Sequence, residues 1–539
     1  MLAFSNAVAL RRGATVMLVL LLSSLALGLL LPIYTDEVGW RFQLSRYLQD
    51  GGVDRFLAET CGANTDATPA FFMMPVRWFS SLLTRFLPDP ALIRLSGVGC
   101  AILGVFGIRM LIRRATDDVR RRATIDLLCF ALLGIGILPL LLVWSRPEQP
   151  LWLAILAAML IAFRRRGNPD ALPLAPVAAI LLLALLAISY HLKALFYLPL
   201  FTLAIILCRQ GDRRFLVRGV ALALLFALAW LGYRYWSQRF ACPDDPVLAA
   251  KLAGENASIL LLGGGWRGTV AIIPDLLANM LPGDYVELSL PKRLYMSDWL
   301  PSDLISADAQ RIWKRIGHSA WNVALATGLI ALLLTVIRSD RRWKPLLTAL
   351  ALIGCATAWA ALQLNKGVYE AALYMPVIVA ALALILAAMP GEGRWLAPIA
   401  WAIAAVSLIS QIALIGLYAP RLWATSGQGG YVAQQPYSLG AYGYAALRRQ
   451  IVSAGAKCGI GPESPRVLID DLTYFTYSEG YRPVHRLGLL SVWNGSAGDP
   501  MTWMRAHGSS GAVIGCHYLP PAMRARAIAT GSFCCVKPN

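Results

Sequence analysis

Long apolar runs recur along this chain of 539 residues, and short polar segments separate them. Most runs approach the ~20 residues that an α-helix needs to cross the hydrocarbon core of a bilayer. The pattern predicts eleven membrane-spanning helices. The first resembles a signal peptide, but no small-residue cleavage site follows it and ten more spans do, so we expect it to be retained. The predicted spans are residues 14–33, 91–111, 124–143, 151–163, 172–189, 193–208, 216–235, 320–338, 345–364, 368–389 and 395–418.

The composition supports this membrane interpretation. Hydrophobic residues make up 58% of the chain and charged residues only 15%. A soluble fold has too little interior to bury so much apolar surface, which excludes an ordinary soluble protein. The net charge of +19 would suggest a nucleic-acid partner in a soluble protein. In a membrane protein it indicates orientation instead, and we expect no nucleic acid.

Basic residues concentrate in alternate connecting segments. One set of segments carries eighteen Arg and Lys, whereas the alternate short loops carry only Arg146, Lys193 and Lys366. Basic residues collect on the cytoplasmic side, so we expect a cytoplasmic N-terminus and, with an odd number of spans, an external C-terminus. The prediction is a multi-pass protein of a bacterial inner (plasma) membrane, with its long segments in the periplasm.

Three long segments then lie outside: residues 34–90, 236–319 and 419–539. We expect residues 1–418 to form a transmembrane domain that includes the first two. Amphipathic stretches at 38–57 and 71–87 predict helices along the membrane surface. The last segment predicts a small extracytoplasmic α/β domain. Its expected strands are 466–470, 511–515 and 533–536, and its expected helices are 501–507 and 521–530.

The ten cysteines divide in the same way. Six lie in the outer segments: Cys61, Cys242, Cys458, Cys516, Cys534 and Cys535. An even number in an oxidising compartment predicts disulfides, with at least one inside the tail; the alternative is six unpaired small hydrophobic residues. No Cys or His pattern has metal-ligand spacing, so no metal site is predicted, although metal assistance stays an open alternative.

Two adjacent carboxylates, Asp36 and Glu37, directly follow the first span. A carboxylate in a partly desolvated place suits a general base that works near neutral pH. The alternative is a solvated helix start, in which Asp36 or Thr35 caps the helix and Glu37 interacts favourably with its dipole.

Further polar groups lie at the same predicted face. Arg146 could present a planar fork to a phosphate, or it could extend to the interface and pair with Glu148. Lys193, next to Tyr190 and His191, lies where basic residues are scarce and begins a span. A carboxylate base and two cations at a bilayer surface fit transfer from a lipid-linked phosphate, because the cations stabilise the departing phosphate.

These segments resemble motifs of the C-type membrane glycosyltransferases (GT-C), a group that includes protein mannosyltransferases and the aminoarabinose transferase of lipid A. Asp36 and Glu37 are similar to the acidic motif of that group, and Arg146 with Glu148 to its Ala-Arg-Pro-Glu/Asp. His191 with Lys193 is similar to its Lys-containing motif. Two weaker matches are Asp66-Ala-Thr-Pro, in place of a Pro-Pro-Leu-Tyr-type segment, and Tyr374-Met-Pro, which lacks the Arg of the late motif.

The resemblance implies a GT-C fold, a polyprenyl-phosphate-linked sugar donor and an inverting single displacement with Asp36 as the base. Glu37 would assist it, and Arg146, Lys193 and His191 would bind the donor phosphate. Asp66, Glu148, Tyr190 and Tyr374 would contact substrate, and the acceptor would be a glycan, a lipid or a protein. The rival interpretations are a transporter or flippase, and a polymerase or ligase of cell-envelope polysaccharide.

Overall fold

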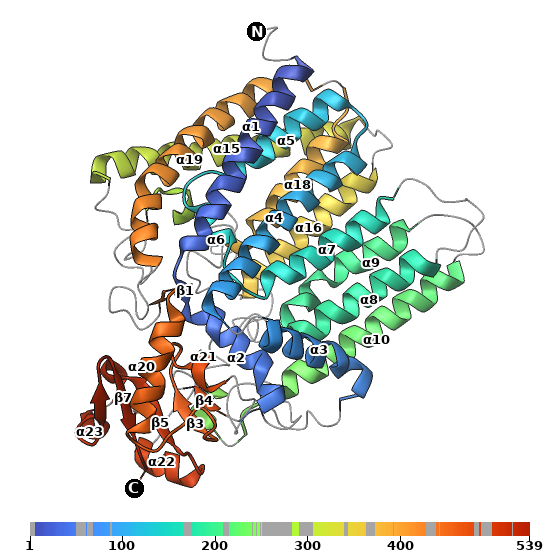
Figure 1. The fold of residues 1–539 in the computed structure, drawn as a ribbon. Coiled ribbons are helices and arrows are strands. Elements are labelled where there is room, and N and C mark those ends of the chain that lie inside the picture. The colour runs from blue at the N-terminus through green and yellow to red at the C-terminus, as the bar shows by residue number, and fades with distance from the viewer. Residues whose placement is uncertain are drawn as a thin grey trace. The chain divides into compact units, whose positions relative to one another are not determined.

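In the computed structural model the chain folds into two compact units (Figure 1). The first unit comprises residues 1–29, 97–230 and 256–421, and the second comprises 30–96, 231–255 and 422–539. The structure describes residues 6–49, 61, 68–86, 89–164, 174–208, 215–239, 241–243, 245–247, 249–250, 283–289, 305–338, 343–362, 372–391, 393–426, 438–440, 442–478, 484–486, 499–519 and 521–538.

The first unit is built from apolar helices. Among the described residues, five helices are long and apolar enough to cross a membrane, which together with the shorter apolar helices makes this a multi-pass membrane protein. The five are α1 (Ala7–Leu27, extended by the turn η2, Gly28–Leu30), α4 (Pro90–Ala115), α10 (Phe215–Arg239), α15 (Ala307–Ile337) and α19 (Leu396–Ser426). The remaining helices of this unit are α5 (Val119–Leu133), α6 (Leu138–Leu142), α7 (Glu148–Ala162), α8 (Leu174–Tyr190), η4 (Leu192–Tyr197), α9 (Leu198–Leu207), η6 (Asp284–Val286), α16 (Trp343–Leu362) and α18 (Met375–Ala388).

Each of the eleven predicted runs coincides with one or more of these helices. The prediction of one continuous helix over 124–143 is wrong, because α5 ends at Leu133 and α6 begins at Leu138. Gly136 lies between them with φ 66°, a conformation that glycine adopts without strain. The buried amides that this break leaves without a helical partner are satisfied, since Gly136 N–H donates to Ser410 Oγ at 2.7 Å and Ile137 N–H to Tyr285 O at 3.0 Å. The predicted run 193–208 likewise begins as the 3₁₀ turn η4 before α9.

Helix α18 lies at the centre of the first unit. It packs against α5, α15 and α16, and nearly every one of its side chains is buried. A helix that is hydrophobic on all sides requires such a position, because it has no polar face to present to water. Around it, α1 packs against α5, and α7 packs against α8 and α9.

The second unit contains a five-stranded sheet in the order β4-β3-β5-β7-β6. Strands β4, β3 and β5 are parallel, and β7 and β6 extend the sheet in antiparallel pairing. Alternate strand residues enter two apolar cores on opposite faces, as the two-residue period of a strand dictates. The strands are β3 (Val467–Ile469), β4 (Val484–Arg486), β5 (Gly511–Gly515), β6 (Ile528–Thr530) and β7 (Phe533–Val536).

Short helices cover both faces of this sheet. Those of the tail are α20 (Tyr444–Ala456), α21 (Tyr474–Tyr477), α22 (Pro500–Ala506), η11 (Cys516–Tyr518) and α23 (Pro521–Arg524). The predicted strands at 466–470, 511–515 and 533–536 and the predicted helix at 501–507 are confirmed. The predicted helix at 521–530 is wrong, because α23 ends at Arg524 and residues 528–530 form β6. Gly531, with φ 59°, turns the chain so that β6 pairs with β7 as a hairpin.

The segment after the first span also belongs to the second unit. Strand β1 (Ile33–Tyr34) pairs antiparallel with β2 (Ser438–Leu439), and helix α2 (Thr35–Gln49) follows directly. Helix α3 (Ala70–Phe86) packs against α2. A helix is therefore confirmed over residues 38–49 of the first predicted amphipathic stretch, whose residues 50–57 lie outside the described residues, and over residues 71–86 of the second. The position of these helices along a membrane surface stays a prediction.

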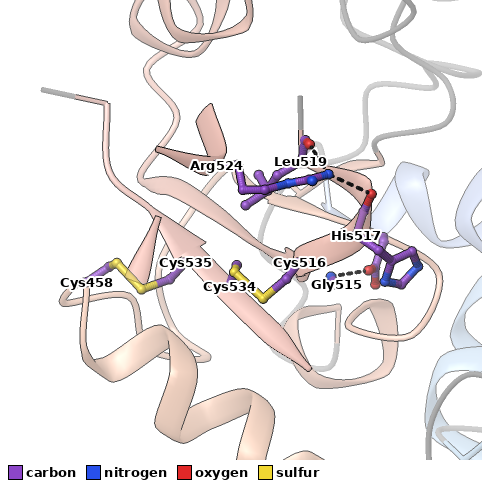
Figure 2. The surroundings of a disulfide bond; sticks show 9 residues. Cys458, Gly515, Cys516, His517, Leu519, Arg524, Cys534 and Cys535 are labelled. Atoms are coloured by element: carbon purple, nitrogen blue, oxygen red, sulfur yellow. Dashed lines mark hydrogen bonds between the residues drawn. A yellow bond between two sulfur atoms is a disulfide. The ribbon is translucent and has the colours of Figure 1, made fainter. Parts of the chain in front are cut away.

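The six cysteines of the segments that we predict to lie outside form three disulfides, as predicted: Cys61–Cys242, Cys458–Cys535 and Cys516–Cys534. Figure 2 shows the last two, which hold neighbouring residues of β7 to the turn after α20 and to the end of β5. Cys100, Cys129, Cys208 and Cys355 are free, which also agrees with the prediction.

Candidate functional site

The acidic pair lies at the start of α2, in the second unit. Tyr34 N–H donates to Glu37 Oε2 at 2.9 Å, so the glutamate side chain reaches back over the first turn of the helix. This is one half of a capping box, in which the third helical residue satisfies an amide that the helix itself cannot. The contact fixes the angle at which the chain passes from β1 into α2.

Glu37 also forms a buried ion pair that the sequence does not reveal. Arg94 Nη2 lies 2.7 Å from Glu37 Oε2, and both side chains are 0% exposed. The same Nη2 donates to Pro32 O at 2.5 Å. Asp36, one residue earlier, is half-buried. The two adjacent carboxylates thus have different surroundings, which favours Asp36 over Glu37 as the group that meets a substrate.

Thr35 connects the start of α2 to the tail of the chain. Its hydroxyl donates to Asp471 Oδ2, on the segment that follows β3. Asp471 is buried, whereas Thr35 is half-buried. Arg94 and Asp471 are residues near the acidic motif that the sequence analysis did not find. The signal that could have drawn attention to Asp471 is the pair of adjacent carboxylates at 470–471, where the predicted strand 466–470 ends.

The cationic residues meet in the first unit, around Glu148 at the start of α7. Lys193 Nζ donates to Glu148 Oε1, and Arg146 Nε lies 3.6 Å from Glu148 Oε2. Glu148 is 2% exposed, against 12% for Arg146 and 15% for Lys193. One buried carboxylate therefore holds two cations in a fixed arrangement, and we call these three residues the cation cluster.

The loop that carries Arg146 is anchored to α4 by a close backbone approach. A Cβ on Gly97 would lie 1.9 Å from Val143 O, so only glycine fits there. Gln149 Nε2 donates to the carbonyls of Gly97, at 3.0 Å, and of Leu142. These contacts fix the position of the start of α7 and therefore the position of Glu148, its first residue.

His191 holds Lys193 in place through the backbone. Its Nδ1 accepts the Lys193 N–H at 3.1 Å and so caps η4, which makes Nε2 the nitrogen that can donate when the ring is neutral. Tyr190, the last residue of α8, is buried. The predicted His191 and Lys193 are therefore brought together, with His191 fixing the turn from which Lys193 projects.

Aromatic rings form one side of the cation cluster. Lys193 Nζ lies 5.2 Å from the centre of the Trp359 ring, within the range of a cation–π interaction. Trp359 packs against Tyr197 at 5.7 Å and against Tyr374 at 5.6 Å between ring centroids. Tyr374 is fully buried and precedes α18, so here it contributes packing. Sequence reasoning did not find Trp359, because nothing in its neighbourhood marks it.

The structure thus brings Arg146, Glu148, Lys193 and His191 together in the first unit. In the second unit it pairs Glu37, the neighbour of Asp36 in the chain, with Arg94. Asp66 lies outside the described residues. Within the part of the chain that the structure describes, no group of three His, Cys, Asp or Glu could hold a metal ion.

Two proteins of known structure are similar to this chain over nearly its whole length. The archaeal oligosaccharyltransferase AglB from Archaeoglobus fulgidus, solved with an inhibitory peptide and a dolichol-phosphate, is 12% identical, with a TM-score of 0.40. That match covers 93% of this chain and 69% of AglB. ArnT from Cupriavidus metallidurans bound to undecaprenyl phosphate is 16% identical, covers 98% of this chain and 97% of its own, and has a TM-score of 0.36. Its apo state gives 15% identity and a TM-score of 0.35, with the same coverage.

No protein-family model matches the chain, and no curated protein matches it significantly.

Proposed function

We propose that this protein is a membrane glycosyltransferase that moves a sugar from a polyprenyl-phosphate donor to an acceptor hydroxyl. The observation that supports this best is the cation cluster. Arg146 with Glu148 and Lys193 are similar to two GT-C motifs that lie about 45 residues apart in the chain, and the fold joins them around one buried carboxylate.

The composition of the cluster suits a lipid phosphate. Arg146 and Lys193 both contact Glu148, so these three residues together bring two positive charges and one negative charge. Glu148 offsets the cost of holding Arg146 and Lys193 in a poorly solvated place and fixes their geometry. A phosphate that approaches the cluster meets a bidentate fork in Arg146 and a point charge in Lys193. The bilayer around the apolar helices would solvate the polyprenyl chain.

In this proposal Asp36 is the general base. Its carboxylate takes the proton of the acceptor hydroxyl while the oxygen attacks the anomeric carbon of the sugar. The bond from that carbon to the phosphate oxygen breaks, and the configuration inverts. The leaving polyprenyl phosphate keeps the electron pair, and Arg146 and Lys193 stabilise its charge.

The proposal also includes the location of the reaction. The distribution of basic residues supports a cytoplasmic N-terminus, which would place Asp36, Arg146 and Lys193 at the outer face of a bacterial inner membrane. The acceptor would be a glycan, a glycolipid or a protein there.

The direct test compares the glycolipids and glycans of a deletion strain with those of the same strain carrying a plasmid copy. We expect the deletion to lose one sugar modification that the wild-type copy restores and Lys193→Ala does not. Lys314→Ala is the matched control, because Lys314 also pairs with a glutamate of the first unit, Glu287, outside the cation cluster. An unchanged glycan profile in the deletion strain, alongside an accumulated or lost transported compound, would favour a transporter instead.

A further inference from the structure

The segment that follows β3 reaches the start of α2 with a carboxylate. Asp470 and Asp471 stand at the carboxyl end of β3, next to the carboxyl end of the parallel strand β5. Their surroundings differ. Asp470 is bonded within the sheet, whereas Asp471 accepts the hydroxyl of Thr35, the residue next to the proposed base.

Asp470 makes this segment rigid. Its Oδ1 accepts the amides of Leu472 and Thr473 at 3.0 and 2.9 Å, and its Oδ2 accepts the amide of Gly515 at 2.7 Å. Thr473 Oγ1 also donates to Val513 O at 2.9 Å. A segment with so many fixed hydrogen bonds presents the neighbouring Asp471 in one orientation, and that orientation is toward Thr35.

The helix α2 is held against the tail by more than this one bond. Tyr34 is paired with Ser438 in the β1–β2 ladder. Val38 and Phe42 enter the same apolar core as Leu472 and Tyr474, with the rings of Phe42 and Tyr474 6.3 Å apart. Residues of the tail thus pack against the helix that begins with the acidic motif. Asp471 adds a polar contact from the tail to the first turn of that helix.

We propose that Asp471 is a positioning residue: it holds Thr35, and through Thr35 the backbone of Asp36, in the geometry that proton transfer requires. This inference rests on the function proposed above and assigns the C-terminal domain a part in catalysis. A base must lie within hydrogen-bond reach of the proton it removes, and a displacement of about 1 Å can cost ~10²-fold in rate. A small loosening of the first turn of α2 therefore has a measurable effect on turnover.

The test measures transfer by the purified full chain in nanodiscs. Detergent-solubilised envelope material of the deletion strain supplies the donor lipid and the unmodified acceptor, whether glycan, glycolipid or protein. We expect Asp471→Ala and Thr35→Val each to lower the maximal rate about tenfold and to leave half-saturation by donor lipid unchanged. The double variant should be no slower than either single variant, because both changes remove the same contact. Thr35→Ser keeps the hydroxyl and should retain the wild-type rate.

Asp499→Ala is the matched control. Asp499 accepts the amide and the hydroxyl of Thr502 at the start of α22, so it is an Asp–Thr contact at a helix start in the same unit, away from the acidic motif. It should lower the melting temperature without changing the rate.

Three results would overturn the inference. They are a wild-type rate in Asp471→Ala, a rate loss that Asp499→Ala shares, and rate losses that multiply in the double variant. Asp36→Asn, measured in the same series, separates this failure from that of the proposed function. Near-normal transfer by Asp36→Asn contradicts the proposed function, whereas its loss together with a normal Asp471→Ala contradicts only the role of Asp471.

Discussion

Glu37 and Glu148 are both buried and both form ion pairs, but Glu37 contacts one described cation and Glu148 contacts two. In the second unit, Glu37 pairs with Arg94, and both are fully buried. In the first unit, Glu148 contacts both Lys193 and Arg146, each of which keeps some exposure. The first arrangement balances its charges and locks a turn. The second gathers positive charge at a partly accessible place. A buried carboxylate near a predicted site can therefore either fix the backbone or organise an anion site, and the number and exposure of its partners tell which.

If Glu37 locks the turn, breaking its pair should be costly. Glu37→Gln leaves Arg94 buried without the opposing charge and should lower the free energy of unfolding by about 3–5 kcal/mol. Replacing both partners, with Glu37→Leu and Arg94→Met, should recover most of that loss. Thermal unfolding of the purified protein checks this. A Glu37→Gln variant that melts like the wild type would show that the pair has no structural role.

If Glu148 organises an anion site, its cations should control phosphate binding. Lys193→Ala and Arg146→Ala should each weaken binding of undecaprenyl phosphate to the purified protein about tenfold or more, because each removes a charge-assisted contact. Lys314→Ala should bind as the wild type does. Equal affinities in all four proteins would remove the cation cluster from the proposed site.

The anchoring of the cluster can be tested at two glycines of α4. Gly97→Ala places a Cβ against Val143 O and should lower the free energy of unfolding by about 1–3 kcal/mol, as over-packing does. Gly99→Ala, in the same helix, meets no atom within 4 Å and should be neutral or slightly stabilising. The melting temperatures of the two variants test this difference, and equal values would contradict the close approach of Gly97 to Val143 O.

The smallest expected effect concerns pH and the second unit. Burial lowers the pKa of His517 below its ordinary value of 6.5, with Arg524 acting in the same direction and Asp470 opposing it. The unfolded chain then takes up a proton near pH 6.5 that the folded chain binds less readily, so stability is lost as the pH falls through that value. His517→Gln should reduce the fall in melting temperature between pH 7.5 and 5.5. An identical fall in both proteins would contradict this.

Much of the local structure could be predicted from the sequence, because it depends on short-range patterns. Long apolar runs mark the helices of the first unit, and short strand-like apolar runs mark β3, β5 and β7. The even number of outer cysteines anticipates the disulfides. The break at Gly136 was missed because its amides are satisfied by Ser410 and Tyr285, which are distant in the chain. The strand β6 was missed because pairing with β7, rather than its own composition, makes it a strand.

The sites show the same limit. Arg146, Glu148, Lys193 and His191 could be selected because each stands at the end of an apolar run, where polar residues are conspicuous. The partners that determine the role of each such residue could not be predicted from the sequence. Arg94 lies 57 residues from Glu37, and Asp471 lies 436 residues from Thr35. No local pattern predicts contacts between residues so far apart in the sequence. Only the fold reveals that Glu37 is held in a buried pair with Arg94 while Asp36 is half-buried.

The central claim is that Asp36 is the base of a transfer from a lipid phosphate. Asp36→Asn keeps the size of the side chain and removes its basicity. Sugar transfer and undecaprenyl phosphate binding should be measured on one preparation that folds and inserts normally. We expect transfer to fall by at least ~10²-fold while the binding affinity stays within twofold of the wild type, about the precision of such measurements. Near-normal transfer by Asp36→Asn would show that the acidic motif only begins a helix, and would contradict the account.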